Sequence, residues 1–262
     1  MANEPQIPAA LSFDGLGDDA RAALDVAATN GYSGVAISTN HPQLRPADLS
    51  LTARRHFRKI LESHHLGLAA LRVAVPRSGF ADPATIDRSM DNAQAAITMA
   101  GDLGITTVAL NVGQLGSTKV SRDTLLAAAR QLASLATHAG ITLALSGDGT
   151  DNLHKLLADL RCPLALANLV PRQSVESGED PLTAAAALAG QIGQLTAADA
   201  IRAGSKVRAV ELGEGQIPWS ELWHLLQDQD FHGPLVVNVR ELSDPATAAA
   251  TAARALRPIL LR

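Results

Sequence analysis

The sequence predicts a single (β/α)8 barrel, the TIM-barrel architecture, over residues 1–262. The first observation is an eightfold alternation of short apolar runs with longer, alanine-rich amphipathic stretches. The second is that composition does not change along the chain at any point that would mark a domain boundary. The third is that no Gly-x-Gly-x-x-Gly motif follows the first apolar run, which disfavours a doubly wound sheet built from the same β-α unit.

The strands are expected where the apolar runs lie, at 8–13, 34–38, 67–73, 106–112, 141–146, 163–169, 192–198 and 234–240. The helices are expected between and after them, at 18–30, 50–65, 83–103, 121–139, 150–160, 180–190, 218–229 and 245–257. An Asp-Pro pair opens three of these helices, because aspartate caps a helix and proline suits its first turn. Glycine follows several helices at 31, 67, 104 and 140, as expected for their C-terminal ends.

Composition and charge exclude several classes of protein. Cys162 is the only cysteine, so neither a disulfide scaffold nor a cysteine-rich zinc module is expected. With 22 basic and 26 acidic residues and 3% aromatics, the chain is not expected to bind nucleic acid. No apolar run reaches the roughly 18 residues of a membrane span, and no secretory leader is recognisable, which predicts a cytoplasmic protein without a membrane partner. The alanine-rich outer helices would also allow a homo-oligomer.

Side-chain alternation in the strands predicts which residues face the barrel axis. One parity carries large apolar residues, which should pack under the helices: Leu11, Phe13, Val35, Ile37, Leu71, Val73, Val108, Leu110, Leu143 and Leu145. The other parity carries small or polar residues near the strand ends: Ser12, Asp14, Ser38, Asn40, Arg72, Asn111, Ser146, Asp148, Asn168, Thr196, Asn238 and Arg240. Barrels of this type build their sites at the C-terminal ends of the strands, so this second set predicts a site. The alternative is that these groups only cap the barrel and bond to one another.

The arginines indicate what such a site would bind. Arg72 and Arg240 are expected to project inward from the third and eighth strands, with Arg77 and Arg172 in following loops. A guanidinium pairs with carboxylate or phosphate through two parallel hydrogen bonds, so we expect a small anionic, carbohydrate-like ligand. The alternative is internal pairing, of Arg72 with Asp14 or Asp148 and of Arg240 with Glu241.

Five segments in this order resemble one known superfamily: GYSGVAIS, AITMAGDLGITTVALNVG, GEDPLTAAAALAGQIGQLTAADA, ELGEGQIPWSELWHLL and FHGPLVVNVRELSDP. They resemble the xylose isomerase-like barrels, the sugar phosphate isomerase/epimerase and endonuclease IV-like superfamily. The resemblance implies a barrel enzyme that holds a divalent cation with acidic residues and a histidine on strands 5 to 8. It also implies proton transfer at carbons beside a carbonyl.

The chain departs from that pattern at all four implied ligand positions, which fall on Ser146, Asn168, Thr196 and Asn238. Neutral side chains do not supply the anionic oxygens that hard divalent cations need, so we expect no metal and no cofactor. A displaced site that uses Asp14, Asp148, Asp199 or Glu241 is the alternative.

Three residues are candidates for acid-base chemistry that would work without a metal. His41 follows the second strand, Asp199 is retained after the seventh strand, and Glu214 lies in the following glycine-bearing loop. The expected substrate-binding residues are Arg72, Asn111, Ser146, Asn168, Arg172, Thr196, Asn238 and Arg240. Two functions follow: a sugar isomerase or epimerase that works without the metal, or an inactive barrel that binds a ligand or a partner.

Overall fold

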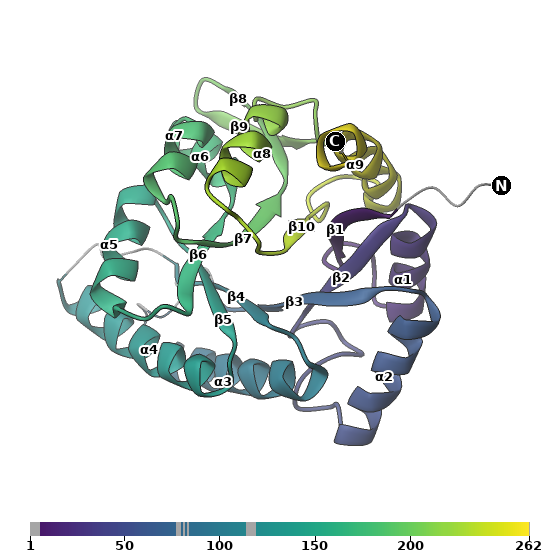
Figure 1. Ribbon diagram of the computed structural model, residues 1–262. Coiled ribbons are helices and arrows are strands. Elements are labelled where there is room, and N and C mark those ends of the chain that lie inside the picture. Colours follow the sequence, from purple (N-terminus) through teal and green to yellow (C-terminus); the bar gives the residue numbers. More distant parts are fainter. Residues whose placement is uncertain (1–5, 77–79, 81, 83, 114–118, 262) are drawn as a thin grey trace.

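Eight parallel strands close into a barrel in the order β1-β10-β7-β6-β5-β4-β3-β2 of this computed structural model, as predicted (Figure 1). The structure describes residues 6–76, 80, 82, 84–113 and 119–261, without the side chains of 119–121. The barrel strands are β1 (Ile7–Ser12), β2 (Tyr32–Ser38), β3 (Gly67–Val73), β4 (Thr107–Asn111), β5 (Thr142–Ser146), β6 (Ala165–Leu169), β7 (Ile192–Ala197) and β10 (Leu235–Val237).

Helices surround the barrel on its outside (Figure 1). They are α1 (Ala20–Thr29), α2 (Leu51–Ser63), α3 (Ile86–Leu103), α4 (Lys119–His138), α5 (Thr150–Leu160), α6 (Pro171–Ser177), α7 (Pro181–Ala187), α8 (Trp219–Asp228) and α9 (Pro245–Leu260). Asp180 and Asp244 cap α7 and α9 by accepting the N–H of Thr183 and Thr247, as their Asp-Pro pairs predict.

Several expected boundaries are wrong by one to three residues, and local hydrogen bonds explain two of them. The helix expected from residue 83 begins at Ile86, because the Asp82 carbonyl accepts the N–H groups of Thr85 and Ile86 in a turn that precedes it. The strand expected over 234–240 ends at Val237. There the Asn238 side chain accepts the Arg240 N–H and turns the chain out of the sheet.

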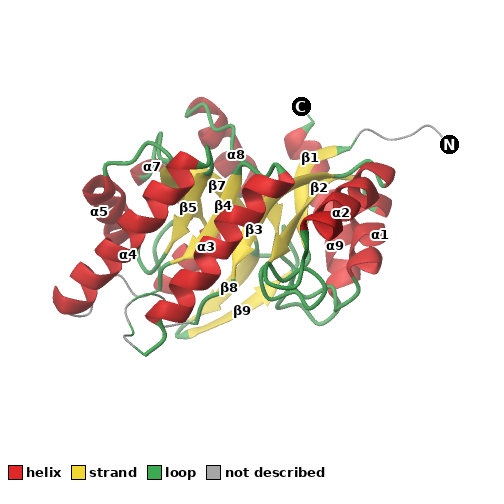
Figure 2. Ribbon diagram, turned by 90° about the horizontal axis from the view of Figure 1, so that it is seen from below, coloured by secondary structure: helices red, strands yellow, loops and turns green. Residues whose placement is uncertain are grey.

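Two elements of the structure were not predicted. Helix α6 follows β6 directly, and an antiparallel hairpin, β8 (Asp199–Ala203) and β9 (Lys206–Val210), follows β7. Figure 2 shows the hairpin lying across the end of the barrel opposite the two chain termini. This is the end where the parallel strands finish, so the hairpin extends that face of the molecule.

The core divides as the strand parity predicts. Leu11, Phe13, Leu71 and Leu110 are buried in the large cluster between barrel and helices. Ala10, Ala36, Ala70 and Val236 form a separate small cluster inside the barrel, as the opposite parity requires. Small side chains thus fill the middle of the barrel, and the polar residues that follow them on each strand lie nearer its C-terminal end.

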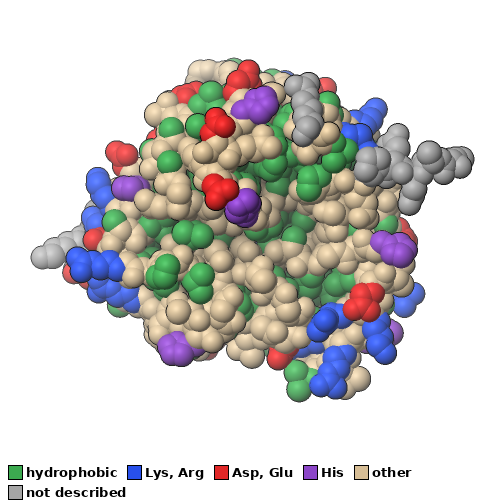
Figure 3. Space-filling view, viewed as in Figure 1, with side chains coloured by type: hydrophobic (Ala, Val, Ile, Leu, Met, Phe, Trp, Pro, Cys, Tyr) green, Lys and Arg blue, Asp and Glu red, His purple; other side chains and the backbone are tan. Residues whose placement is uncertain are grey.

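The N-terminal ends of the barrel strands carry few groups that could hold a polar ligand. A shallow cavity of about 280 Å³ there is lined by Ser33 and otherwise by apolar residues and glycine, among them Pro8, Ala10, Leu68 and Leu235. Figure 3 shows hydrophobic side chains gathered near the middle of the face seen in Figure 1. In the described part of the chain, no helix is long and apolar enough to cross a membrane.

Candidate functional site

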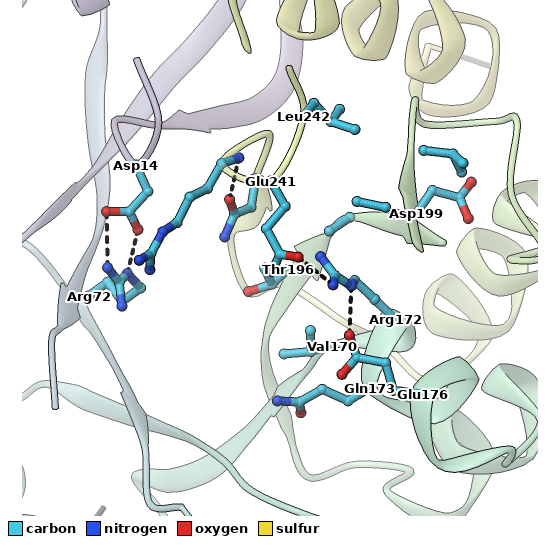
Figure 4. A pocket seen from close by; sticks show the side chains of 15 residues that line it. Asp14, Arg72, Val170, Arg172, Gln173, Glu176, Thr196, Asp199, Glu241 and Leu242 are labelled. Carbon is cyan, nitrogen blue, oxygen red and sulfur yellow. Dashed lines mark hydrogen bonds and ion pairs between the residues drawn. The ribbon is translucent and has the colours of Figure 1, made fainter. Parts of the chain in front are cut away.

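A cavity of about 180 Å³ opens at the C-terminal ends of the strands (Figure 4). Loops after β1, β6, β7 and β10, the helix α6 and the hairpin strand β9 all contribute to its wall. Its lining residues are Asp14, Arg72, Val170, Arg172, Gln173, Glu176, Thr196, Ala198, Asp199, Ala209, Val210, Asn238, Arg240, Glu241 and Leu242. Six of the predicted site residues are among them: Arg72, Arg172, Thr196, Asp199, Asn238 and Arg240.

Arg72 projects from β3 toward the cavity and pairs with Asp14 from the end of β1 (Figure 4). Its Nε donates to Asp14 Oδ2 over 2.5 Å, and its Nη2 donates to Asp14 Oδ1 over 3.0 Å. The same Nη2 reaches Ser38 Oγ on β2 at 3.1 Å. This two-point pairing fixes the plane of the guanidinium and places a compensating negative charge beside it. The pairing of Arg72 with Asp14 was one of the predicted alternatives.

Arg172 lies at the start of α6 between two glutamates (Figure 4). Its Nε donates to Glu176 Oε1 over 2.8 Å and its Nη2 to Glu241 Oε2 over 2.6 Å. Burial works against the charged form, but the hydrogen bonds and charges of Glu241 and Glu176 raise the pKa of Arg172. Glu241 therefore pairs with Arg172, not with Arg240 as the sequence alternative proposed.

Arg240 differs from the other two arginines of the cavity. Within the described residues its guanidinium makes no hydrogen bond or ion pair, and its side chain is exposed to solvent. Its backbone is held on two sides. The Arg240 N–H donates to Asn238 Oδ1 over 3.1 Å, and Gly15 packs so closely that an added Cβ there would lie 2.6 Å from Arg240 Cα.

Neutral polar groups occupy the strand ends where the resemblance implies metal ligands. Thr196 Oγ1 donates to Asn168 Oδ1 over 2.8 Å and accepts from Gln194 Nε2 over 3.1 Å. The Asn238 carbonyl oxygen accepts the Arg240 N–H. The oxygens of these three side chains are thus bonded to protein donors and carry no negative charge, a donor set that does not fit a hard divalent cation.

Three of the four acids offered as a displaced metal site bind protein groups. Asp14 pairs with Arg72, Glu241 with Arg172, and Asp199 with N–H groups. The part of the chain that the structure describes contains no group of three or more His, Cys, Asp or Glu side chains that could hold a metal ion.

Asp199 lines the cavity, but its carboxylate is directed to the loop that follows the hairpin. Oδ2 accepts from Gly213 N at 3.0 Å, Gly215 N at 3.2 Å and Trp219 Nε1 at 2.9 Å, and Oδ1 accepts from Ala200 N at 2.8 Å. The side chain is buried. These bonds account for a structural role, and the catalytic role expected for Asp199 stays a prediction.

The structure places two other acid-base candidates away from the described lining of this cavity. Glu214 is exposed in its loop and does not line the cavity. His41 is buried against Phe13, with ring centroids 5.7 Å apart, and its Nε2 has no partner among the described residues. Burial lowers the pKa of His41, and the charges of Asp18 and Asp14 oppose that shift only in part.

Three predicted ligand-binding residues also lie outside the lining of the cavity, and one loop arginine is not described. Asn111 is exposed and accepts the Gly113 N–H over 2.7 Å, whereas Ser146 and Asn168 are buried. Arg77 lies outside the described residues.

Residues that sequence reasoning missed are Gln194, Gln173 and Glu176. Gln194 had a usable signal, because it precedes Thr196 by two residues and so faces the same side of β7. Glu176 had a weaker one, since Pro171 directly after β6 marks the first turn of a short helix.

The closed parallel barrel with a polar cavity at its C-terminal face defines the general class of (β/α)8 barrels that hold their sites there. The family model for the xylose isomerase-like TIM barrel matches residues 24–259, so the chain belongs to this family. No curated protein matches it.

Solved structures share the fold at low sequence identity. The xylose isomerase domain protein from Planctomyces limnophilus is 17% identical with a TM-score of 0.84, over 99% of this chain and 100% of that one. A xylose isomerase-like TIM barrel protein from Mycobacterium smegmatis, solved with magnesium, is 16% identical with a TM-score of 0.81, over 97% and 96%. The D-allulose 3-epimerase from a Methylomonas species is 16% identical with a TM-score of 0.75, over 98% and 99%.

Proposed function

We propose that this barrel binds a small anionic carbohydrate in the cavity at its C-terminal face, without a divalent metal ion. The observation that carries the proposal is the meeting of Arg72, Arg172 and Arg240 around a cavity in which the side chains at the ends of β7 and β10, Thr196 and Asn238, are neutral. One of the solved structures that share this fold is a D-allulose 3-epimerase. A sugar-like ligand therefore fits both the family and the polar lining.

The polar groups of the cavity match the two kinds of atom that such a ligand presents. Carboxylates of Asp14 and Glu241 accept from sugar hydroxyls, while the free amide hydrogens of Asn238 and the Arg240 guanidinium donate to ligand oxygens. A cavity of about 180 Å³ holds a single small ring or open-chain sugar, well below the usual ~300–1,000 Å³ of drug-sized sites.

Binding without turnover is the function that the geometry supports best. Enolisation at a carbon beside a carbonyl needs a base within reach and a positive charge at the developing oxyanion. Glu214 is exposed outside the cavity, the Asp199 carboxylate accepts four N–H groups, and His41 is not part of the lining. The family's metal, which would supply the charge, has no fitting ligands among Asn168, Thr196 and Asn238.

The second candidate is a sugar isomerase or epimerase that works without metal, and one pair favours it. Asp14 lines the cavity beside Arg72, so its carboxylate would take the proton while the guanidinium stabilises the enediolate oxygen. In that case the pair would have to open when the substrate binds.

A ligand panel distinguishes these functions. Thermal shift and calorimetry would be run with sugar acids, sugar phosphates and neutral polyols, each with EDTA and with added Mn²⁺. Arg72→Gln removes a cavity guanidinium, and Arg58→Gln, exposed on α2, is the matched control.

We expect an anionic sugar to raise the melting temperature of wild type and Arg58→Gln equally, with or without Mn²⁺, and to raise that of Arg72→Gln less. No binding by any anionic sugar would refute the proposal, as would binding that requires Mn²⁺. Product formation in EDTA would establish the second candidate.

A further inference from the structure

The ionisable side chains that line the cavity differ in whether they have a protein partner. Arg72 is held by Asp14, and Arg172 by Glu176 and Glu241. The Asp199 carboxylate is satisfied by N–H groups. Among the lining residues that the structure describes, Arg240 is the arginine whose guanidinium has no protein partner.

The backbone at Arg240 is fixed although its side chain is free. Gly15, at φ +92°, has a backbone conformation that other residues rarely adopt, and this lets the loop after β1 pack against Arg240 Cα. On the other side, Asn238 accepts the Arg240 N–H. The free guanidinium thus extends from an anchored position at the cavity wall, next to the loop that carries Asp14.

The charge of the cavity limits the charge of the ligand. Its described lining holds four carboxylates, Asp14, Glu176, Asp199 and Glu241, against three arginines. A doubly charged phosphoryl group would add two negative charges near these carboxylates and would find one unpaired guanidinium. A carboxylate adds one charge, and its two oxygens match the planar fork of a single arginine.

We propose that the ligand is a sugar carboxylate, an aldonic or uronic acid, and that Arg240 is the residue that selects its carboxylate. The inference rests on the proposed function, because it assigns the anionic group of the ligand in that same cavity. The paired arginines, Arg72 and Arg172, then serve to orient Asp14 and Glu241 toward ligand hydroxyls.

Calorimetry tests this selection with three probes of one carbon skeleton: D-gluconate, D-glucose 6-phosphate and the neutral polyol D-glucitol. D-galacturonate extends the acid class to a ring form. Wild type, Arg240→Gln, Arg240→Lys and the control Arg58→Gln are compared, with circular dichroism to confirm that each is folded. Arg240→Lys keeps the charge but loses the two-point geometry.

We expect wild type and Arg58→Gln to bind a sugar acid at least about tenfold more tightly than the phosphate and the polyol. Arg240→Gln should lose this preference, and Arg240→Lys should retain only part of it. Tighter binding of the phosphate would overturn the sugar-carboxylate inference and leave the proposed function standing. An unchanged preference in folded Arg240→Gln would overturn the role of Arg240. If none of the anionic probes binds wild type, the proposed function itself fails.

Discussion

Removing the Asp199 carboxylate tests whether that residue serves structure or catalysis. In Asp199→Ala, the N–H groups of Gly213 and Gly215 and the indole N–H of Trp219 lose their shared acceptor. A hydrogen bond to a charged group contributes about 1.5–3 kcal/mol. The two glycines lie in a loop that water can enter, whereas the Trp219 side chain is buried and its donor stays unsatisfied.

We therefore expect Asp199→Ala to lower the free energy of unfolding by roughly 3–5 kcal/mol, since solvation recovers part of the three bonds. For a domain of this size that corresponds to a fall in melting temperature of about 6–20 °C. Urea unfolding followed by circular dichroism and by tryptophan fluorescence measures it, because Trp219 is one of only two tryptophans and reports on this contact.

A double-mutant cycle strengthens the test. A Cβ at residue 215 would lie 1.8 Å from Asp199 Oδ1, so Gly215→Ala should disturb the same contact and its effect should not add to that of Asp199→Ala. Glu214→Ala, in the same loop but exposed, is the control and should leave stability within about 0.5 kcal/mol of wild type. If Asp199→Ala is as stable as wild type and only ligand conversion is lost, the structural reasoning is refuted and Asp199 is catalytic.

Three further perturbations test other parts of the structure. Because the pKa of buried His41 is lowered, the unfolded chain binds a proton at this histidine more readily than the folded chain, so stability should fall as pH drops below about 6.5. The melting temperature of His41→Gln should decline less steeply with falling pH, and an unchanged pH dependence would contradict this. Tyr32→Phe removes the buried 2.8 Å bond from the Tyr32 hydroxyl to the Ala249 carbonyl and should cost about 1 kcal/mol in urea unfolding, whereas no loss would show that bond to be inert. Gly233→Ala would put a Cβ 2.2 Å from the Gly193 carbonyl oxygen and should lower the free energy of unfolding by about 1–3 kcal/mol. Wild-type stability would mean that the backbone at Gly193 and Gly233 can move apart without cost.

Much of the fold was predictable because the information is local. Strand parity separates Leu11, Leu71 and Leu110 in the outer core from Ala10 and Ala70 inside the barrel, and a period of two residues is visible in sequence. Helix caps such as Asp180 are equally local, because the capping side chain and its backbone partner are three residues apart.

The hairpin β8–β9 was missed for a physical reason. Its two strands are five residues each, lie outside the barrel and leave Arg202 and Arg208 at least partly exposed, so they lack the continuous apolar runs that mark the barrel strands. The buried Asp199 holds this segment in place. In a sequence, a single aspartate after a strand looks the same whether it binds backbone N–H groups, takes part in catalysis or coordinates a metal ion.

The site was predictable as a set of positions but not as a set of partners. That Arg72, Thr196 and Asn238 reach one cavity follows from strand parity. The pairing of Arg172 with Glu241 does not follow from strand parity, because 69 residues separate the two and the position of Arg172 depends on helix α6. The side of the loop on which Glu214 lies is likewise set by tertiary packing, not by spacing.

Metal binding tests most directly whether the neutral side chains of Asn168, Thr196 and Asn238 have replaced a metal site. Metal content of the untagged protein by elemental analysis, followed by calorimetry with Mn²⁺, should show no stoichiometric metal and no binding heat below about 1 mM, because Asn168, Thr196 and Asn238 offer no anionic oxygen. A variant that restores acids and a histidine at all four implied positions, Ser146→Glu with Asn168→Asp, Thr196→His and Asn238→Glu, serves as the positive control. Tight, stoichiometric Mn²⁺ in the wild-type chain would refute the metal-free site and favour the metal-dependent chemistry that the resemblance implies.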